Sequence, residues 1–169
     1  MDFLRLLAAG RCGALDTFFS GLTYFGSEIA FMAAALLIFW CVDKRQGYYV
    51  FLVGALGTVC NQFLKLAFRI PRPWVLDPDF QIVEAARADA TGYSFPSGHT
   101  AASFASVAAL KTANSRLWKP ALALAVVIAL SRLYLYAHWP TDILGGAAVG
   151  ALAGWLGTKL AQSFPRKKM

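Results

Sequence analysis

Long apolar runs separated by short charged junctions dominate the chain. Four runs, at 23–42, 47–68, 117–136 and 140–162, are each close to the roughly 20 residues that an α-helix needs to cross a bilayer. A fifth run, at 98–113, is shorter and rich in Ala and Ser, which lets neighbouring helices approach closely. We predict an all-α, integral-membrane helical bundle of five to six helices, with the fifth run buried inside it.

The N-terminal segment 2–21 departs from this pattern because Arg5, Arg11 and Asp16 interrupt its apolar residues. Such a mixed segment favours a helix lying in the membrane interface, and a first membrane span is the alternative. It has no basic stretch before an uninterrupted apolar core, so we expect no cleavable signal peptide.

Glycine recurs at every fourth position of the last run, at Gly146, Gly150 and Gly154. Small residues at this spacing form a helix face that packs closely against a neighbour. We assign this face a packing role only.

Composition agrees with a membrane protein. Of the 169 residues 58% are apolar and 15% are charged, which is unlike a typical soluble domain, and the length suggests a single domain over 1–169. The net charge of +7 is carried partly by short junctions between apolar runs, so we expect no nucleic-acid partner. Cys12, Cys41 and Cys60 have neither disulfide nor metal-ligand spacing and are predicted to be buried apolar side chains.

The distribution of Lys and Arg predicts the orientation of the bundle. The junctions 43–46 and 111–119 and the C-terminus lie on one side if the helices alternate, and that side is predicted to be cytoplasmic. The segments 69–97 and 137–139 then lie on the extracytoplasmic side. The basic residues concerned are Lys44, Arg45, Lys111, Arg116, Lys119, Arg166, Lys167 and Lys168.

Three polar clusters fall near the extracytoplasmic ends of the runs. Each ionisable residue at membrane depth costs about 2.5–3.5 kcal/mol, so its presence there indicates a functional role. The first is KLAFRIPRP, 65–73, in which Lys65 closes a span and Arg72 follows seven residues later. Pro71 and Pro73 flank Arg72 and make continuation of the helix unlikely. On its own this cluster is typical of a basic patch that contacts lipid headgroups.

The second cluster is FPSGHT, 95–100. Ser97 is a candidate N-cap, Gly98 allows a ligand to approach the backbone, and His99 lies in the first turn. A helix N-terminus is a ready anion site, although a capped helix start without a ligand explains the same residues.

The third cluster is SRLYLYAHWPTD, 131–142. Pro140 suits the first turn of a helix, which places His138 at its start and Asp142 within reach of the imidazole ring. A carboxylate bonded to one ring nitrogen leaves the other nitrogen free as a nucleophile, and Arg132 ends the preceding run towards the same face. Helix capping by the same two residues is the alternative.

Taken together, the cationic side chains, helix amides and a hydroxyl form a socket for a tetrahedral dianion. Two histidines then have separate roles, since one can attack phosphorus while the other protonates the leaving oxygen.

These motifs resemble the signature of the type-2 phosphatidic acid phosphatases, or lipid phosphate phosphatases, which share their site with vanadium haloperoxidases. That signature has three parts, and all its specified residues are present with the family's internal spacings. They are Lys65 with Arg72-Pro73, Pro96-Ser97-Gly98-His99, and Ser131-Arg132 with His138 and Asp142.

The resemblance implies that His138 is a nucleophile forming a phosphohistidine, that Asp142 orients it, and that His99 is the general acid and then the base. It implies no metal and no other cofactor. The phosphate-binding residues that it implies are Lys65, Arg72, Ser97, Gly98 and Arg132.

We therefore predict a multi-pass cell-membrane lipid phosphatase with an extracytoplasmic site and a phosphorylated membrane lipid as substrate. Undecaprenyl diphosphate and phosphatidylglycerol phosphate are the favoured substrates, as the resemblance suggests for a chain of this size. A transporter or lipid-translocating protein that uses the cationic cleft only for binding is the alternative. The loop 74–95 is a candidate lid or headgroup selector because of its length, and Arg69 is a candidate contact for a second phosphate or a headgroup. The sequence indicates no oligomeric state.

Overall fold

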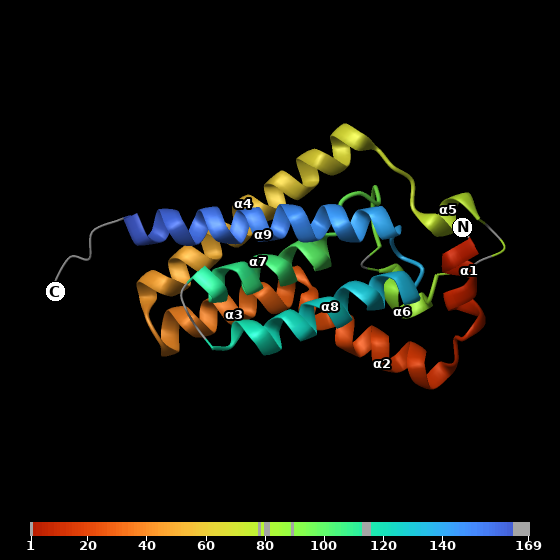
Figure 1. The fold of residues 1–169 in the computed structure, drawn as a ribbon, viewed down its shortest axis with the longest axis horizontal. Helices are drawn as coiled ribbons and strands as arrows, with labels where there is room; N and C mark the ends of the chain where they lie inside the picture. Colours follow the sequence, from red (N-terminus) through yellow and green to blue (C-terminus); the bar gives the residue numbers. More distant parts are fainter. Residues whose placement is uncertain (1, 78, 80–81, 89, 113–115, 164–169) are drawn as a thin grey trace.

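The fold is a bundle in which most of the long helices run roughly along one direction, whereas the N-terminal helix lies across that direction (Figure 1). The computed structural model describes residues 2–77, 79, 82–88, 90–112 and 116–163. These residues form helices and no strand, which confirms the predicted all-α class. The helices are α1 (Asp2–Ala9), α2 (Gly13–Thr23), the 3-10 helix η1 (Tyr24–Gly26), α3 (Glu28–Cys41), α4 (Lys44–Phe68), α5 (Pro73–Leu76), α6 (Glu84–Arg87), α7 (Gly98–Thr112), α8 (Trp118–Tyr134) and α9 (Pro140–Ser163).

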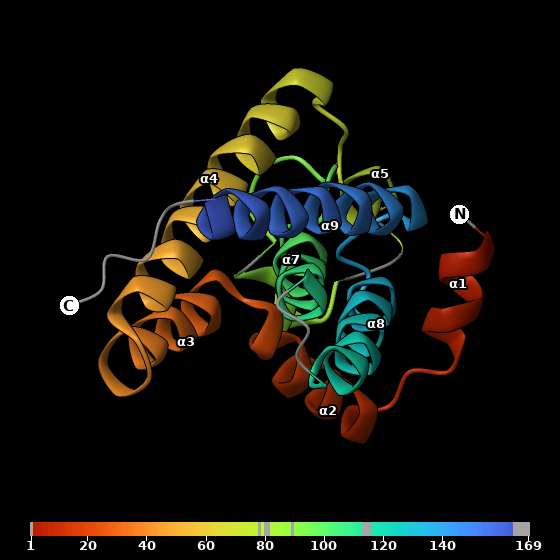
Figure 2. The same cartoon turned by 60° about the vertical axis from the view of Figure 1, so that its left-hand side comes forward.

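Helix α7 lies in the middle of the bundle. It packs against α9, α8, α4 and α3, and Figure 2 shows these helices arranged around it. Its Ala and Ser side chains allow these close approaches. The prediction that the run 98–113 lies inside the bundle is therefore confirmed for residues 98–112, while residue 113 is outside the described residues.

Glycines on α9 permit its tight contact with α7. A Cβ atom on Gly150 would lie 2.1 Å from the carbonyl oxygen of Ala101, and one on Gly154 would lie 2.2 Å from that of Ala105. Both obstacles are backbone atoms, so the two helices would have to move apart to admit a side chain. The predicted packing face is thus the α7–α9 interface.

We expect Gly150→Ala to destabilise the protein by about 1–3 kcal/mol, the usual cost of overpacking a close-fitted site. Gly21→Ala is the matched control, because a Cβ there meets nothing within 4 Å and alanine favours a helix by up to about 1 kcal/mol. Thermal unfolding in detergent measures both. Equal melting temperatures for the two variants would show that the α7–α9 contact tolerates a side chain.

Membrane-crossing segments are fewer than the four predicted. Among the described residues, Gln46–Leu76 and Pro140–Leu160 are each long and apolar enough to cross a membrane. The pair Gly13–Gly26 and Glu28–Cys41 qualifies only if counted as one span with a 48° bend. Helix α8, the predicted span 117–136, has 17 residues and is somewhat short for a bilayer core.

The N-terminal region differs from the prediction in two places. The segment 2–21 is two helices rather than one, because the chain breaks between Ala9 and Gly13. The predicted span 23–42 starts late, since α3 begins only after Ser27, whose hydroxyl accepts a hydrogen bond from the Ala30 amide at 3.1 Å and caps the helix.

Helix α1 is anchored on the end of α8 and on Asp77, which follows α5. Leu4 is buried against Leu133 and Tyr136, and the Arg5 guanidinium donates to Asp77 at 2.7 Å and 3.0 Å. Phe3 and Leu6 remain exposed on the other side. An exposed apolar stripe on a short helix is typical of a segment lying in the membrane interface, and this position of α1 stays a prediction.

The outer surface of the bundle is apolar. Trp40 on α3 and Phe63 on α4 are at least 70% exposed, as expected for side chains that face lipid. Cys12, Cys41 and Cys60 are also exposed, so the prediction that they are buried is wrong. A thiol behaves as a small apolar group, which allows it to face lipid as well as a core.

The ends of the bundle separate the charged junctions from the polar motifs. The α3–α4 and α7–α8 junctions and the end of α9 lie at one end, whereas α5, α6 and the start of α9 lie at the other (Figure 1). This agrees with the predicted common side for the basic junctions. Arg166, Lys167, Lys168 and the side chain of Arg45 lie outside the described residues.

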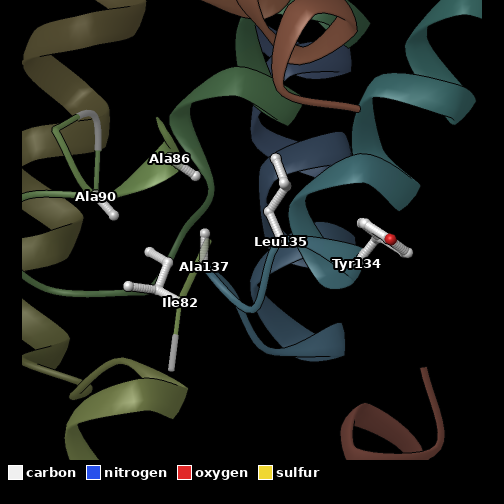
Figure 3. Packing of buried hydrophobic residues seen from close by; sticks show 6 residues of the cluster. All are labelled: Ile82, Ala86, Ala90, Tyr134, Leu135 and Ala137. Atoms are coloured by element: carbon white, nitrogen blue, oxygen red, sulfur yellow. The ribbon is translucent and has the colours of Figure 1, made fainter. Parts of the chain in front are cut away.

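The segment after α5 packs on the connection between α8 and α9. Ile82, Ala86 and Ala90 lie beside Leu135 and Ala137 (Figure 3), and together with Tyr134 they form a buried apolar cluster. The Val83 amide also donates to the Leu135 carbonyl at 3.4 Å. This contact places the loop predicted as a lid against the backbone that leads into His138.

Candidate active site

A buried His–Asp pair lies where α8 passes into α9. Pro140 begins α9, as predicted, so His138 precedes the helix and Asp142 lies in its first turn. His138 Nδ1 is 3.2 Å from Asp142 Oδ2, which also accepts from the Trp139 amide at 2.7 Å and from the Ser94 hydroxyl. Three donors thus converge on one carboxylate oxygen and fix the orientation of the ring.

Arg72 holds the other side of the His138 ring. Its guanidinium is 2% exposed and donates to the carbonyls of Thr91 (2.7 Å), Gly92 (3.0 Å) and Ala137 (2.9 Å). Its Nη1 also lies 3.4 Å from His138 Nε2. Because a guanidinium only donates hydrogen bonds, Nε2 is the ring nitrogen that carries the lone pair, and Nδ1 carries the proton.

His99 lies opposite, at the start of α7. Ser97 caps this helix, since its hydroxyl accepts from the Thr100 amide and hydroxyl at 3.4 Å and 3.0 Å. The Ser97 amide donates to the Asp142 carbonyl at 3.1 Å, which ties the start of α7 to that of α9. His99 Nε2 is buried and has no hydrogen-bond partner among the described residues, so it is available to a ligand.

Two more cations complete the cluster. Arg132, at the end of α8, is fully buried and donates from Nη1 to Thr23 Oγ1 at 3.2 Å. Lys65 lies in the last turn of α4. The charges of Lys65, Arg72 and Arg132 all act on the rings of both His99 and His138. The structure therefore brings every predicted site residue, Lys65, Arg72, Ser97, Gly98, His99, Arg132, His138 and Asp142, into one place.

The His138 imidazole is held neutral. Burial lowers the pKa of His138 well below its ordinary value, and the positive charges of Arg132, Arg72 and Lys65 act in the same direction. A neutral ring keeps the Nε2 lone pair available. Its tautomer and its charge are thus both suited to nucleophilic attack.

This pKa shift predicts a pH-dependent difference in stability. Above about pH 6.5 His138 is neutral in both states, but below it the unfolded chain binds a proton that the folded chain does not. The advantage of the wild-type protein over His138→Gln should therefore shrink as the pH falls from 7.5 to 5.5, by about 3–5 °C in Tm per pH unit at most. Parallel pH profiles of the two melting temperatures would contradict a buried neutral imidazole.

Several residues of the site were not predicted. Ser94 and the Trp139 amide bind Asp142, Thr23 binds Arg132, and Arg72 is held by loop carbonyls. Ser94 lies three residues before Ser97, and only this proximity to the FPSGHT motif could have indicated it. Arg69 caps the end of α4 in a left-handed conformation (φ 50°) and donates from Nε back to the Leu66 carbonyl.

The described geometry has a counterpart among known proteins. A family model described as the PAP2 superfamily matches residues 46–166, which include every predicted site residue. The chain belongs to the PAP2 superfamily. This confirms the resemblance drawn from the three motifs, and the chain is accordingly a membrane-integral lipid phosphatase, as predicted.

Individual members of the PAP2 superfamily are similar over most of the chain. The undecaprenyl-diphosphatase BcrC of Bacillus subtilis is 30% identical over 78% of this chain and 69% of its own length. The putative undecaprenyl-diphosphatase YbjG of Escherichia coli is 42% identical over 78% of this chain and 64% of its own length. The crystal structure of Aquifex aeolicus LpxE superposes with a TM-score of 0.77 at 27% identity, covering 94% of this chain and 93% of that one.

Proposed function

We propose that the protein hydrolyses undecaprenyl diphosphate in the membrane through a phosphohistidine at His138. The observation that carries this proposal is the fixed His138 ring, with Asp142 on Nδ1, Arg72 beside Nε2 and the unpartnered Nε2 of His99 in the same cluster. The substrate is supported by the undecaprenyl-diphosphatases among the similar proteins.

In the first step, His138 Nε2 attacks the terminal phosphorus and forms an N–P bond. The bond between that phosphorus and the bridging oxygen breaks. His99, protonated once the negative charge of the bound substrate offsets the neighbouring cations, gives its proton to the departing lipid phosphate. In the second step, His99 takes a proton from water, the oxygen of which attacks phosphorus. The N–P bond breaks, inorganic phosphate leaves, and both histidines return to their starting states.

The charges around the site suit this chemistry. Phosphoryl transfer depends mainly on positioning and on stabilising charge spread over the phosphoryl oxygens. Lys65, Arg72 and Arg132 supply three positive charges, and the first turn of α7 supplies backbone N–H groups without intrahelical partners. We assign Ser97 and Gly98 to phosphate binding at this helix start.

We further propose that the site faces the extracytoplasmic side. The basic α3–α4 and α7–α8 junctions lie at the opposite end of the bundle, and cytoplasmic junctions carry the excess of Lys and Arg. The polar cluster would then meet a lipid headgroup at the outer surface, with α1 in the same interface.

The test is phosphate release by the purified protein from undecaprenyl diphosphate, phosphatidylglycerol phosphate, lipid A and phosphatidic acid, assayed separately with excess chelator. We expect the highest kcat/KM for undecaprenyl diphosphate, undiminished activity in chelator, and inhibition by vanadate. Preference for another of these lipids would overturn the substrate assignment. Binding of every lipid without any phosphate release would support the transporter alternative instead.

A further inference from the structure

An apolar cavity of about 410 Å³ opens beside the catalytic cluster. Both Asn61 on α4 and Gly98 at the start of α7 line it, so it reaches the residue next to His99. From there it follows α4 back to Phe51, a length of about 15 Å at 1.5 Å per residue. Its size is typical of a small-molecule site. Residues from four helices line its apolar part, among them Phe31, Gly54, Thr58, Ala102 and Val149.

Asn61 is a buried polar residue in the lining of this cavity, and its contacts within the protein do not explain why an amide lies there. It is 3% exposed, its Oδ1 is buried, and it makes no side-chain hydrogen bond among the described residues. The Nδ2 group likewise makes no hydrogen bond among the described residues, so it can donate to a ligand, whereas Oδ1 can only accept. Its Nδ2 lies only 3.3 Å from the position that a Cβ atom on Gly98 would take, so the amide is in direct contact with the start of α7.

Asn61 is also placed to meet the leaving group. It lies one helical turn before Lys65, and it borders the cavity at Gly98, next to His99, the proposed acid for the departing oxygen. Glu28 lines the same end, and its negative charge acts on Lys65. An ionised carboxylate can only accept hydrogen bonds, whereas the Asn61 amide can donate to an anion.

We propose that Asn61 binds the lipid-linked phosphate of a polyprenyl diphosphate, with the start of the prenyl chain lying in the cavity along α4. The Nδ2–H group donates to an oxygen of the phosphate that leaves, while the terminal phosphate is transferred to His138. This rests on the proposed function, and it makes Asn61 a determinant of diphosphate recognition beyond the family motifs.

Two near-isosteric variants test the contact. Asn61→Leu removes the donor, and Asn61→Asp places a negative charge against the leaving phosphate. We expect kcat/KM for undecaprenyl diphosphate to fall about 10- to 100-fold in Asn61→Leu, the usual effect of losing a hydrogen bond to a charged group, and further in Asn61→Asp. Vanadate needs only the terminal phosphate site and does not contact Asn61 in this arrangement. Its inhibition constant should therefore change less than about threefold.

The neighbouring amide supplies the control. Gln62 is exposed on the same helix, so Gln62→Leu and Gln62→Glu should match the wild-type protein on both readouts. Equal losses of turnover and vanadate binding in the Asn61 variants would indicate general damage to the site and overturn the inference, as would wild-type turnover. A wild-type protein inactive on undecaprenyl diphosphate would overturn the proposed function as well, and it would be detected before any variant is assayed.

A second pair of variants tests the chain in the cavity. Thr58→Phe fills the cavity one turn from Asn61, whereas Val59→Phe points outward, where Val59 is 65% exposed. We expect Thr58→Phe to lower the ratio of kcat/KM for undecaprenyl diphosphate to that for p-nitrophenyl phosphate, which has no prenyl chain, at least about tenfold, because the cavity buries the apolar start of the prenyl chain only. An unchanged ratio would place the chain elsewhere.

Discussion

Replacing His138 by alanine should abolish phosphate release, with a loss on the order of 10⁶-fold in kcat, the effect seen when a covalent nucleophile is removed. His138 is the ring whose Nε2 lone pair faces the cationic cluster while Nδ1 is bonded to Asp142. No other described nucleophile has this arrangement. An assay of phosphate release from undecaprenyl diphosphate measures the loss. Its detection limit should lie below the uncatalysed rate in the control membranes.

The control for this variant is its folded state. Its elution volume in detergent should match that of the wild-type protein, because Arg72 and Arg132, the proposed phosphate-binding arginines, keep their own contacts with loop carbonyls and Thr23. Turnover within tenfold of wild type would exclude His138 as the nucleophile. If His138→Ala aggregates, the same assay is carried out on His138→Gln, the side chain of which retains more of the volume of the ring.

Asp142→Asn should lower kcat by about 10³- to 10⁴-fold, the size of effect expected when an imidazole loses its tautomer-fixing carboxylate. Asp142 Oδ2 accepts from His138, Trp139 and Ser94 at once. An amide offers one oxygen and a donating nitrogen, so the ring can turn to the tautomer protonated on Nε2, which has no lone pair for phosphorus.

Thr141→Ala is the matched control, since Thr141 is exposed in the same first turn of α9. It should retain wild-type kcat and KM. If Asp142→Asn kept more than a tenth of wild-type kcat, the carboxylate would not set the tautomer of His138.

The sequence was sufficient to predict the four helices that carry the site. The runs 47–68, 98–113, 117–136 and 140–162 correspond to α4, α7, α8 and α9 within a few residues. Proline and serine defined their ends, since Pro140 starts α9 and Ser97 caps α7. Because the motifs lie at these helix ends, their spacing also predicted which candidate site residues lie close together.

The hydrophobic pattern alone predicted the helix boundaries less accurately in the N-terminal region. The run 23–42 contains Ser27 and Glu28, a start signal for a helix, but its continuous hydrophobic character concealed the boundary. The break between α1 and α2 at Gly10–Cys12 was likewise hidden inside the segment 2–21. A lipid-facing helix has no amphipathic period to mark its ends, so capping residues carry most of the information.

The supporting contacts of the site could not be predicted because they join distant parts of the chain. Arg72 reaches the carbonyls of Thr91 and Gly92, which lie 19 and 20 residues further on, and Arg132 reaches Thr23 across 109 residues of sequence. No local pattern specifies a backbone acceptor. Asn61 was missed for a related reason, since a single amide within an apolar run is revealed as unpartnered only once α7 is packed against it.

The most direct test of the account is rapid acid-free quenching of His99→Ala during turnover of an aryl phosphate, such as p-nitrophenyl phosphate. This leaving group needs no protonation, so His138 should still be phosphorylated, while hydrolysis of the N–P bond should be slow without the His99 base. We predict a burst of one p-nitrophenol per chain and an acid-labile, base-stable phosphate that peptide mapping places on His138. Steady product release with no burst and no phosphate on His138 would contradict the central claim.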